Sequence, residues 1–203
     1  MIQLSEKDYL TEGLARKCYF HPENENRCIK IGIAGVDESH LTKEIDYYKK
    51  ISKKNTEAFN YPFFSFYHGT EDTNFGKGYV YDLVRDETTN EVSKTLRHYI
   101  FAKDSILNDF VLDESLQRLK SQMIEHKVFA SDLRPRNICC KILSDGSVQM
   151  IIVDGLGHRD FLPLADMFHY FAKQKIERRF QKIALQSIAD HRQMLRQKYN
   201  EDV

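Results

Sequence analysis

A polar loop followed at once by a tight hairpin is the feature that most limits how this chain can fold. The loop SDLRPRN spans residues 131–137, and the apolar runs ICCKIL and VQMIIVDG follow it on either side of the turn SDGS. So short a turn pairs its flanking strands antiparallel, which brings the start of the first strand beside the end of the second. We therefore expect the loop and Asp154, at the end of the hairpin, to lie at one end of a small sheet.

Side chains with oxygen atoms collect at that end of the hairpin. Carboxylate and amide oxygens suit Mg²⁺, which usually takes one or two protein carboxylates together with substrate phosphates. We predict that Asn137 and Asp154 are metal ligands, which leaves Asp132 to orient or deprotonate a hydroxyl. Arg134 and Arg136 add positive charge beside them. The alternative is that Asp132 and Asn137 only stabilise turns, as these residue types often do.

Hydrophobic periodicity predicts an α+β fold with a β-rich front and an α-rich back. The predicted strands are RKCYF and RCIKIGI around the turn HPENEN, and FFSFYH and GYVYDLV around a turn at residues 69–78. The predicted helices cover residues 41–54, the run TLRHYIF, residues 113–126 and most of the chain after Pro163. No internal repeat or linker interrupts the pattern, so we expect a single domain.

Composition excludes several other classes of protein. The 203 residues include 30 basic and 30 acidic side chains, so the broad basic face of a nucleic-acid-binding protein is not expected. The N-terminal run MIQLSEKDYLTEG differs from a signal peptide, and no apolar stretch reaches the length of a membrane span. The cysteines, Cys18, Cys28, Cys139 and Cys140, form no C-x-x-C pair. Free thiols in a reducing cytoplasm are therefore expected, rather than a zinc site or disulfides.

The polar loop resembles the catalytic loop of protein-kinase-like enzymes. SDLRPRNI matches the pattern D-[LI]-[KR]-P-x-N-[ILV], and VDG resembles the metal-binding D-F-G segment. The resemblance implies that Asp132 is the catalytic base, that Asn137 and Asp154 hold Mg²⁺, and that Arg134 steadies charge beside the acceptor. It also implies a reduced bilobal fold, with an N-lobe of about residues 1–83 and a C-lobe of about residues 84–203.

Segments upstream of the loop resemble the nucleotide-binding parts of the same superfamily. CIKI resembles the strand whose lysine, here Lys30, holds the α- and β-phosphates of ATP, and the next helix offers Glu44 as the partner of that lysine. GYVYDLV resembles the strand that leads into the hinge, which implies that Asp82 and Val84 lie at the nucleotide. Gly13 is the glycine that TEGLARKC shares with the phosphate-covering loop. Taken singly, Lys30 could instead be an edge-strand lysine that points to solvent, and Glu44 an exposed helix charge.

The sequence departs from the kinase pattern at several positions. Thr11 and Arg16 stand where the phosphate-covering loop has its other two glycines, which implies a stiffer loop, and charge from Arg16 or Lys17 would compensate. Ala130 and Ser131 replace the histidine and arginine of H-R-D, and D-F-G has become Asp154-Gly155-Leu156-Gly157. Neither of these two changes removes a metal ligand.

Two motifs in the chain are decoys. The literal HRD at residues 158–160 follows the metal-binding strand, and Ala165 stands where its asparagine should be. The run GKG at residues 76–78 is not a phosphate-binding P-loop, because Glu71 replaces the required first glycine.

A second resemblance covers more of the chain. The run RKCYFHPENENRCIKI, the run GYVYD and the short C-terminal tail resemble the YrbL family of the PhoP regulatory network, small bacterial proteins with a protein-kinase-like fold. This resemblance implies a cytoplasmic bacterial protein. It adds no catalytic residue.

We interpret the chain as an ATP- and Mg²⁺-dependent phosphotransferase with an alcohol acceptor. After Asp154 the chain has neither the anchor nor the room for the helical platform on which protein kinases bind their substrates, which favours a small-molecule phosphoacceptor. The open alternative is a pseudokinase, a nucleotide-binding or regulatory interaction module without catalysis. A purely structural protein would have to explain why carboxylates and cations gather at one place.

Overall fold

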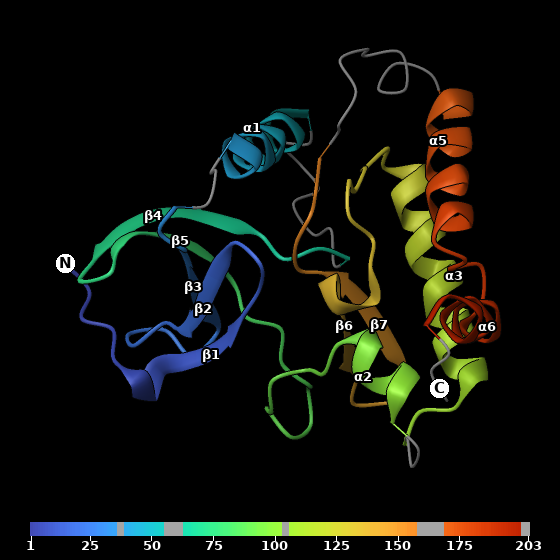
Figure 1. Cartoon of the computed structure of the whole chain (residues 1–203), viewed down its shortest axis with the longest axis horizontal. Helices are drawn as coiled ribbons and strands as arrows, with labels where there is room; N and C mark the ends of the chain where they lie inside the picture. The colour runs from blue at the N-terminus through green and yellow to red at the C-terminus, as the bar shows by residue number, and fades with distance from the viewer. Residues whose placement is uncertain (36–38, 55–62, 103–105, 158–168, 200–203) are drawn as a thin grey trace. The chain divides into compact units, whose positions relative to one another are not determined.

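The computed structural model describes residues 1–35, 39–54, 63–102, 106–157 and 169–199. The chain divides into two compact units, Met1–Phe59 with Ser65–Arg85, and Asn60–Phe64 with Asp86–Val203. The first unit contains a five-stranded sheet and a long helix, and the second contains a two-stranded sheet with helices (Figure 1). The predicted α+β class is confirmed.

The sheet of the first unit is antiparallel throughout, with strand order β1-β2-β3-β5-β4. After a short 3-10 helix, η1 (Glu6–Asp8), its strands are β1 (Tyr9–Glu12), β2 (Arg16–Phe20), β3 (Arg27–Gly32), β4 (Tyr67–Thr73) and β5 (Gly76–Asp82). The predicted hairpin of RKCYF and RCIKIGI is confirmed as β2 and β3. Strand β1 was not predicted, because its side chains are exposed or half-buried and show no apolar alternation.

The strand predicted at FFSFYH and the turn predicted at residues 69–78 are both wrong in extent, because β4 begins only at Tyr67. Strand β4 continues to Thr73 and β5 begins at Gly76, so only two residues connect them. Strand β4 lies at the edge of the sheet, and its side chains alternate between half-buried and exposed until Thr73. Polar residues suit such an edge, which is why the run GTEDT looked like part of a turn.

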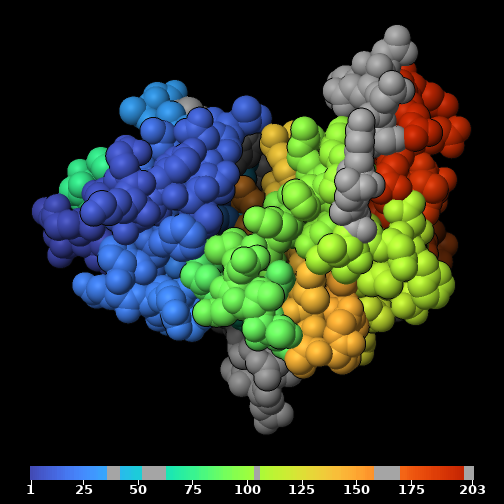
Figure 2. Space-filling view, turned by 90° about the horizontal axis from the view of Figure 1, so that it is seen from below, coloured from blue at the N-terminus to red at the C-terminus, as the bar shows by residue number. Residues whose placement is uncertain are grey.

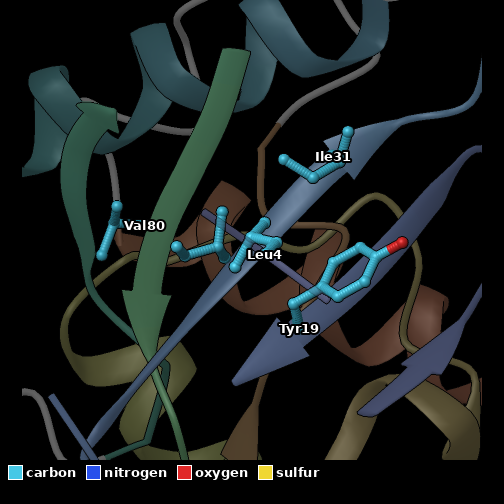
Figure 3. Close-up of a cluster of buried hydrophobic side chains, with 5 residues drawn as sticks. Leu4, Tyr19, Ile31 and Val80 are labelled. Atoms are coloured by element: carbon cyan, nitrogen blue, oxygen red, sulfur yellow. The ribbon is translucent and has the colours of Figure 1, made fainter. Parts of the chain in front are cut away.

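One face of this sheet carries an apolar cluster of Leu4, Tyr19, Ile29, Ile31 and Val80 (Figure 3). Ile29 lies opposite both Tyr19 and Val80 in the strand register, so the three side chains share a face. Alternation along the strand then directs Lys30 to the opposite face.

Gly78, the second glycine of GKG, packs against this cluster. A Cβ atom at residue 78 would lie 2.5 Å from Cγ2 of Ile29 and 3.1 Å from Cγ2 of Thr73. The absence of a side chain therefore lets β5 approach its neighbours closely. This packing explains the GKG run without a phosphate-binding loop.

Helix α1 (Ser39–Lys54) lies against the other face of the sheet (Figure 1). The Tyr48 ring lies 5.9 Å from the Tyr81 ring, and its hydroxyl donates to the Ser65 carbonyl at 2.7 Å. The helix predicted at residues 41–54 is confirmed as part of α1. Tyr47 and Ile51 are also buried, so they lie on the inner face of this helix.

The second unit is built around the predicted hairpin. Its elements are α2 (Leu96–Phe101), α3 (Asp109–Glu125), the 3-10 helix η2 (Pro135–Asn137), β6 (Ile138–Ile142), β7 (Val148–Ile152), α5 (His169–Lys182) and α6 (Ile188–Tyr199). Strands β6 and β7 pair antiparallel with Ile138 opposite Ile152, as expected. Helix α3 begins at Asp109 rather than at the predicted residue 113, because the Asn108 side chain caps it by accepting from the Val111 amide at 3.0 Å.

The long helix α3 supports the hairpin and the C-terminal helices. The Ser115 hydroxyl donates to the Val148 carbonyl of β7 at 2.8 Å. Helix α5 packs beside α3, and both views show the two side by side (Figures 1 and 2). The literal HRD at residues 158–160 lies outside the described residues. No helix in the described ranges combines the length and apolarity needed to cross a membrane.

The cysteines are free thiols, as predicted. Cys28, Cys139 and Cys140 are buried, and burial raises the pKa of the Cys140 thiol well above its usual value. These side chains behave as small apolar groups.

Candidate active site

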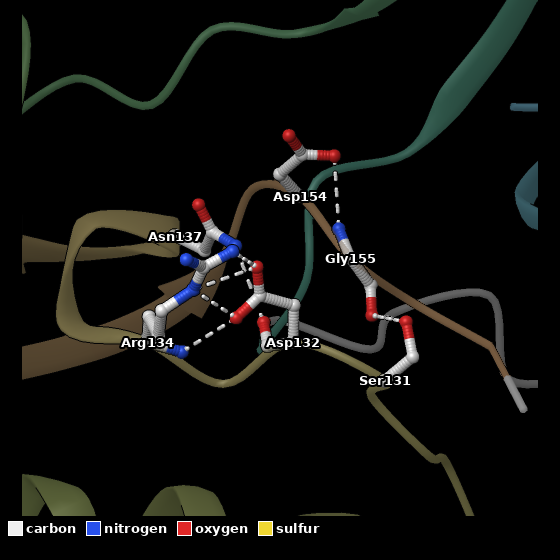
Figure 4. A network of polar contacts seen from close by, with 6 residues as sticks. All are labelled: Ser131, Asp132, Arg134, Asn137, Asp154 and Gly155. Atoms are coloured by element: carbon white, nitrogen blue, oxygen red, sulfur yellow. Dashed lines mark hydrogen bonds and ion pairs between the residues drawn. The ribbon is translucent and has the colours of Figure 1, made fainter. Parts of the chain in front are cut away.

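The loop and the end of β7 are held together by backbone hydrogen bonds, which assemble the predicted site within the second unit. The Val153 amide donates to the Asn137 carbonyl at 2.9 Å, which extends the β6–β7 pairing by one step. The Ser131 amide donates to the Gly155 carbonyl at 2.7 Å. Figure 4 shows the result: Asp132, Arg134 and Asn137 contact one another, and Asp154 lies beside them at the end of the strand.

Gly155 permits this close approach. Its backbone is left-handed, with φ +78°, and a Cβ atom there would lie 2.8 Å from both Cβ and the carbonyl oxygen of Asp132. The loop and the strand end therefore touch where the chain has no side chain. Gly155 is thus needed for the geometry of the site, a role that was not predicted from the sequence.

Asp132 forms a bidentate ion pair with Arg134. Nε of Arg134 donates to Oδ1 at 2.8 Å and to Oδ2 at 3.0 Å, and Nη2 donates to Oδ2 as well. Burial raises the pKa of Asp132, but the hydrogen bonds from Arg134 outweigh it, and the pKa lies below its usual value. Asp132 is therefore an ionised acceptor at neutral pH. The Arg134 side chain remains 52% exposed, so it can also meet a ligand.

Asn137 and Asp154 are the residues predicted to hold a metal ion. Asn137 is 8% exposed, and its Nδ2 donates to the Asp132 carbonyl at 3.3 Å, which holds the amide at the site. The Asp154 carboxylate accepts from the Gly155 amide at 2.9 Å. Among the described residues no group of three or more His, Cys, Asp or Glu could hold a metal. One carboxylate and one amide suit Mg²⁺ completed by phosphate and water, so the residues present fit that ion.

Lys30 and Glu44 lie in the first unit, and the alternatives considered for them are wrong. Lys30 is on the inner strand β3 and only 9% exposed, and its Nζ lies 4.3 Å from the centre of the Tyr81 ring. It is therefore not an edge-strand lysine. Glu44 is 5% exposed and forms an ion pair with Arg16, with Nη2 to Oε2 at 3.1 Å. It is not a solvated helix charge.

The remaining predicted binding residues are also in the first unit. The Asp82 carboxylate accepts from the Phe66 amide at 2.9 Å and contacts His68 Nε2 at 2.5 Å, and Val84 is buried. The Gly13 amide donates to the carbonyl of residue 16 at 2.8 Å, which closes the β1–β2 hairpin. Their roles at a nucleotide stay predictions.

Sequence reasoning missed two residues that shape these groups. Tyr81 covers the Lys30 ammonium, and nothing in GYVYDLV distinguished it from the tyrosine two positions earlier. Arg16 was expected to add charge to the phosphate-covering loop, but its ion pair with Glu44 was not predicted.

Comparison with known proteins identifies the family. A model of the family described as PhoP regulatory network protein YrbL matches residues 2–187. The chain is 32% identical over 190 residues to the uncharacterized protein YrbL of Escherichia coli (strain K12), covering 92% of this chain and 88% of that protein. The uncharacterized protein YrbL of Shigella flexneri matches with the same identity and coverage. The chain belongs to the YrbL family.

Proposed function

We propose that this protein is an ATP- and Mg²⁺-dependent phosphotransferase with a reduced protein-kinase-like fold, which transfers the γ-phosphoryl group to a hydroxyl of a small molecule. The observation that carries the proposal is the convergence of Asp132, Asn137 and Asp154 in the second unit, in the order and context of a kinase catalytic loop. The catalytic loop and the metal-binding strand are joined backbone to backbone.

The buried charges of the first unit support the same proposal. Burial of an ammonium group is unfavourable unless a partner compensates it. Lys30 is buried on an inner strand with its ammonium over the Tyr81 ring, on the face that α1 covers, and Glu44 of that helix is buried as well. A phosphate-binding lysine and its carboxylate partner have this arrangement of strand and helix in kinases.

Each residue would have a distinct role. Lys30, oriented by Glu44, would hold the α- and β-phosphates, and Asn137 and Asp154 would hold Mg²⁺. When bound, the ion would neutralise charge on the transferred phosphoryl group. Asp132 would orient the acceptor hydroxyl and take up its proton. Arg134 must release at least one oxygen of Asp132 for this, and its exposed side chain can turn to the phosphoryl oxygens instead.

A pseudokinase function is the second candidate, and one observation favours it. Both carboxylate oxygens of Asp132 accept hydrogen bonds from Arg134, so the base is occupied in this structure. A module that binds nucleotide to regulate a partner would need the metal ligands but not a free base. The two candidates therefore differ in turnover and not in nucleotide binding.

Calorimetric titration with ATP, with and without Mg²⁺, tests the proposal on the wild type, Asp154→Asn and the control Asp145→Asn. Asp145 is an exposed aspartate in the turn between β6 and β7, where it accepts from the Ser147 amide. We expect magnesium-dependent binding that Asp154→Asn weakens and Asp145→Asn leaves intact. If the wild type binds no nucleotide at millimolar concentration, the proposal is wrong.

Turnover then distinguishes the two candidates. Asp132→Ala should leave Mg-ATP binding nearly intact and lower phosphoryl transfer to a hydroxyl acceptor by about 10²–10⁴-fold. Full activity of Asp132→Ala against the true acceptor would contradict the role of the base. Magnesium-dependent binding with no transfer to a broad panel of hydroxyl compounds would favour the pseudokinase.

A further inference from the structure

The ion pair of Arg16 and Glu44 joins the β1–β2 hairpin to helix α1. Arg16 is the first residue of β2, and Glu44 lies in the first half of α1. Nη2 of Arg16 lies 3.1 Å from Oε2 of Glu44, and the side chains are 15% and 5% exposed. This contact is therefore not one of the solvated surface pairs that contribute little to stability.

Arg16 shares a sheet face with Lys30. In the β2–β3 register Arg16 lies opposite Gly32, and Cys18 lies opposite Lys30. Residues two apart along a strand point the same way, so Arg16, Cys18 and Lys30 all project from one face. This is the face that α1 covers.

Contacts one turn farther along α1 connect Glu44 to the surroundings of Lys30. Tyr48 follows Glu44 by four residues, so the two share a face of the helix. The Tyr48 ring lies 5.9 Å from the Tyr81 ring, which in turn lies under the Lys30 ammonium, 4.3 Å from ring centre to Nζ. One face of α1 thus meets Arg16 through Glu44 and the neighbourhood of Lys30 through Tyr48.

We infer that Arg16 is a positioning residue of the nucleotide site, which acts through Glu44. It stands where the phosphate-covering loop of kinases has a glycine. Through its ion pair with Glu44, it attaches this loop to α1. By holding the Glu44 carboxylate, Arg16 fixes the orientation in which Glu44 serves Lys30, before nucleotide binds. This inference rests on the proposed function, because the group that Lys30 would bind is a phosphate.

A positioning role for Arg16 differs from a direct contact between Arg16 and phosphate. A direct contact would act independently of Glu44, whereas a positioning residue has an effect only while Glu44 is present. Interaction between two residues in contact appears as non-additivity of their substitutions, and independent effects add. A double-mutant cycle therefore separates the two possibilities.

The variants are Arg16→Met, Arg16→Lys, Glu44→Gln and the double variant Arg16→Met/Glu44→Gln, with Lys77→Met as control. Lys77 is an exposed cation at the start of β5, so its loss changes the net charge equally. Arg16→Met alone leaves a buried carboxylate without this cation and could fail to fold. The double variant removes both charges, and Arg16→Lys keeps the cation, so the cycle remains measurable.

The measurements are dissociation constants for Mg-ATP and for adenosine, which lacks phosphate. We expect Arg16→Met to weaken Mg-ATP binding by about tenfold or more, the effect of losing a hydrogen bond to a charged group. Adenosine binding should stay unchanged, Arg16→Lys should restore part of the affinity, and Lys77→Met should match the wild type. Within the Glu44→Gln background, Arg16→Met should change Mg-ATP affinity by less than about twofold.

The alternative results have separate meanings. A full loss from Arg16→Met in the Glu44→Gln background would overturn the positioning role in favour of direct phosphate contact. Equal losses for Mg-ATP and adenosine would reduce Arg16 to a structural residue. Wild-type Mg-ATP affinity in Arg16→Met would overturn the inference and leave the proposed function standing. Absence of Mg-ATP binding by the wild type would refute both.

Discussion

Substitution of Gly155 by alanine probes the contact on which the candidate site depends. Residue 155 has φ +78°, a left-handed conformation that costs an L-residue about 1–2 kcal/mol. The added Cβ would also lie 2.8 Å from both Cβ and the carbonyl oxygen of Asp132, closer than such atoms approach one another. Overpacking of this kind costs about 1–3 kcal/mol. Gly155→Ala should therefore destabilise the protein by about 2–5 kcal/mol.

Gly146 provides a matched control in the turn between β6 and β7. It has φ +80°, nearly the value of Gly155, but no described atom lies within 4 Å of the position that its Cβ would take. Gly146→Ala should therefore destabilise the protein only by the cost of the left-handed backbone, about 1–2 kcal/mol. The difference between the two variants isolates the clash with Asp132.

Urea unfolding of both variants, followed by circular dichroism, gives the two free-energy changes. We expect Gly155→Ala to lose about 1–3 kcal/mol more than Gly146→Ala. Equal losses would mean that the loop and the strand end are not in contact at Gly155. That result would contradict the contact between Asp132 and the end of β7 on which the candidate site depends.

Three further predictions test other parts of the structure. Arg134→Ala should raise the pKa of Asp132 in a carbon-13 NMR titration, because burial is then opposed by fewer hydrogen bonds; an unchanged pKa would contradict the ion pair. Since the folded pKa of Asp132 lies below its reference value of 3.8, its ionised form stabilises the fold above that pH, and this contribution is lost as the pH falls through the folded pKa. Gly78→Ala should lower the urea midpoint, because its Cβ would lie 2.5 Å from Cγ2 of Ile29, and an unchanged midpoint would contradict this close packing. Asn108→Ala should cost about 1 kcal/mol through loss of the α3 cap, whereas no loss would place the helix start elsewhere.

The candidate site of the second unit was predictable because it is local. Asp132, Asn137 and Asp154 flank one hairpin, and a short turn allows few ways to pair its strands. The order of the residues along the chain therefore implied their proximity. The Asp132–Arg134 ion pair joins residues two apart, but its bidentate geometry depends on the turn between them and could not be read from spacing.

The elements were predictable where burial alternates or follows a helical period, and not elsewhere. The hairpin of β2 and β3 and helix α1 have such patterns. Strand β1 and most of β4 do not, because an edge strand pairs on one side only and tolerates polar residues on its exposed positions. Backbone pairing with a neighbour made them strands.

The sequence by itself determined the α+β class, the YrbL resemblance and the residues that meet at the end of the β6–β7 hairpin. Only the tertiary structure decided that Lys30 is buried on an inner strand and that Glu44 is bound by Arg16, 28 residues away. It also decided that Gly78 and Gly155 are required by close packing. Local patterns record which way a side chain points along its own element. Which distant side chain it meets depends on how strands and helices pack, and that information belongs to the whole fold.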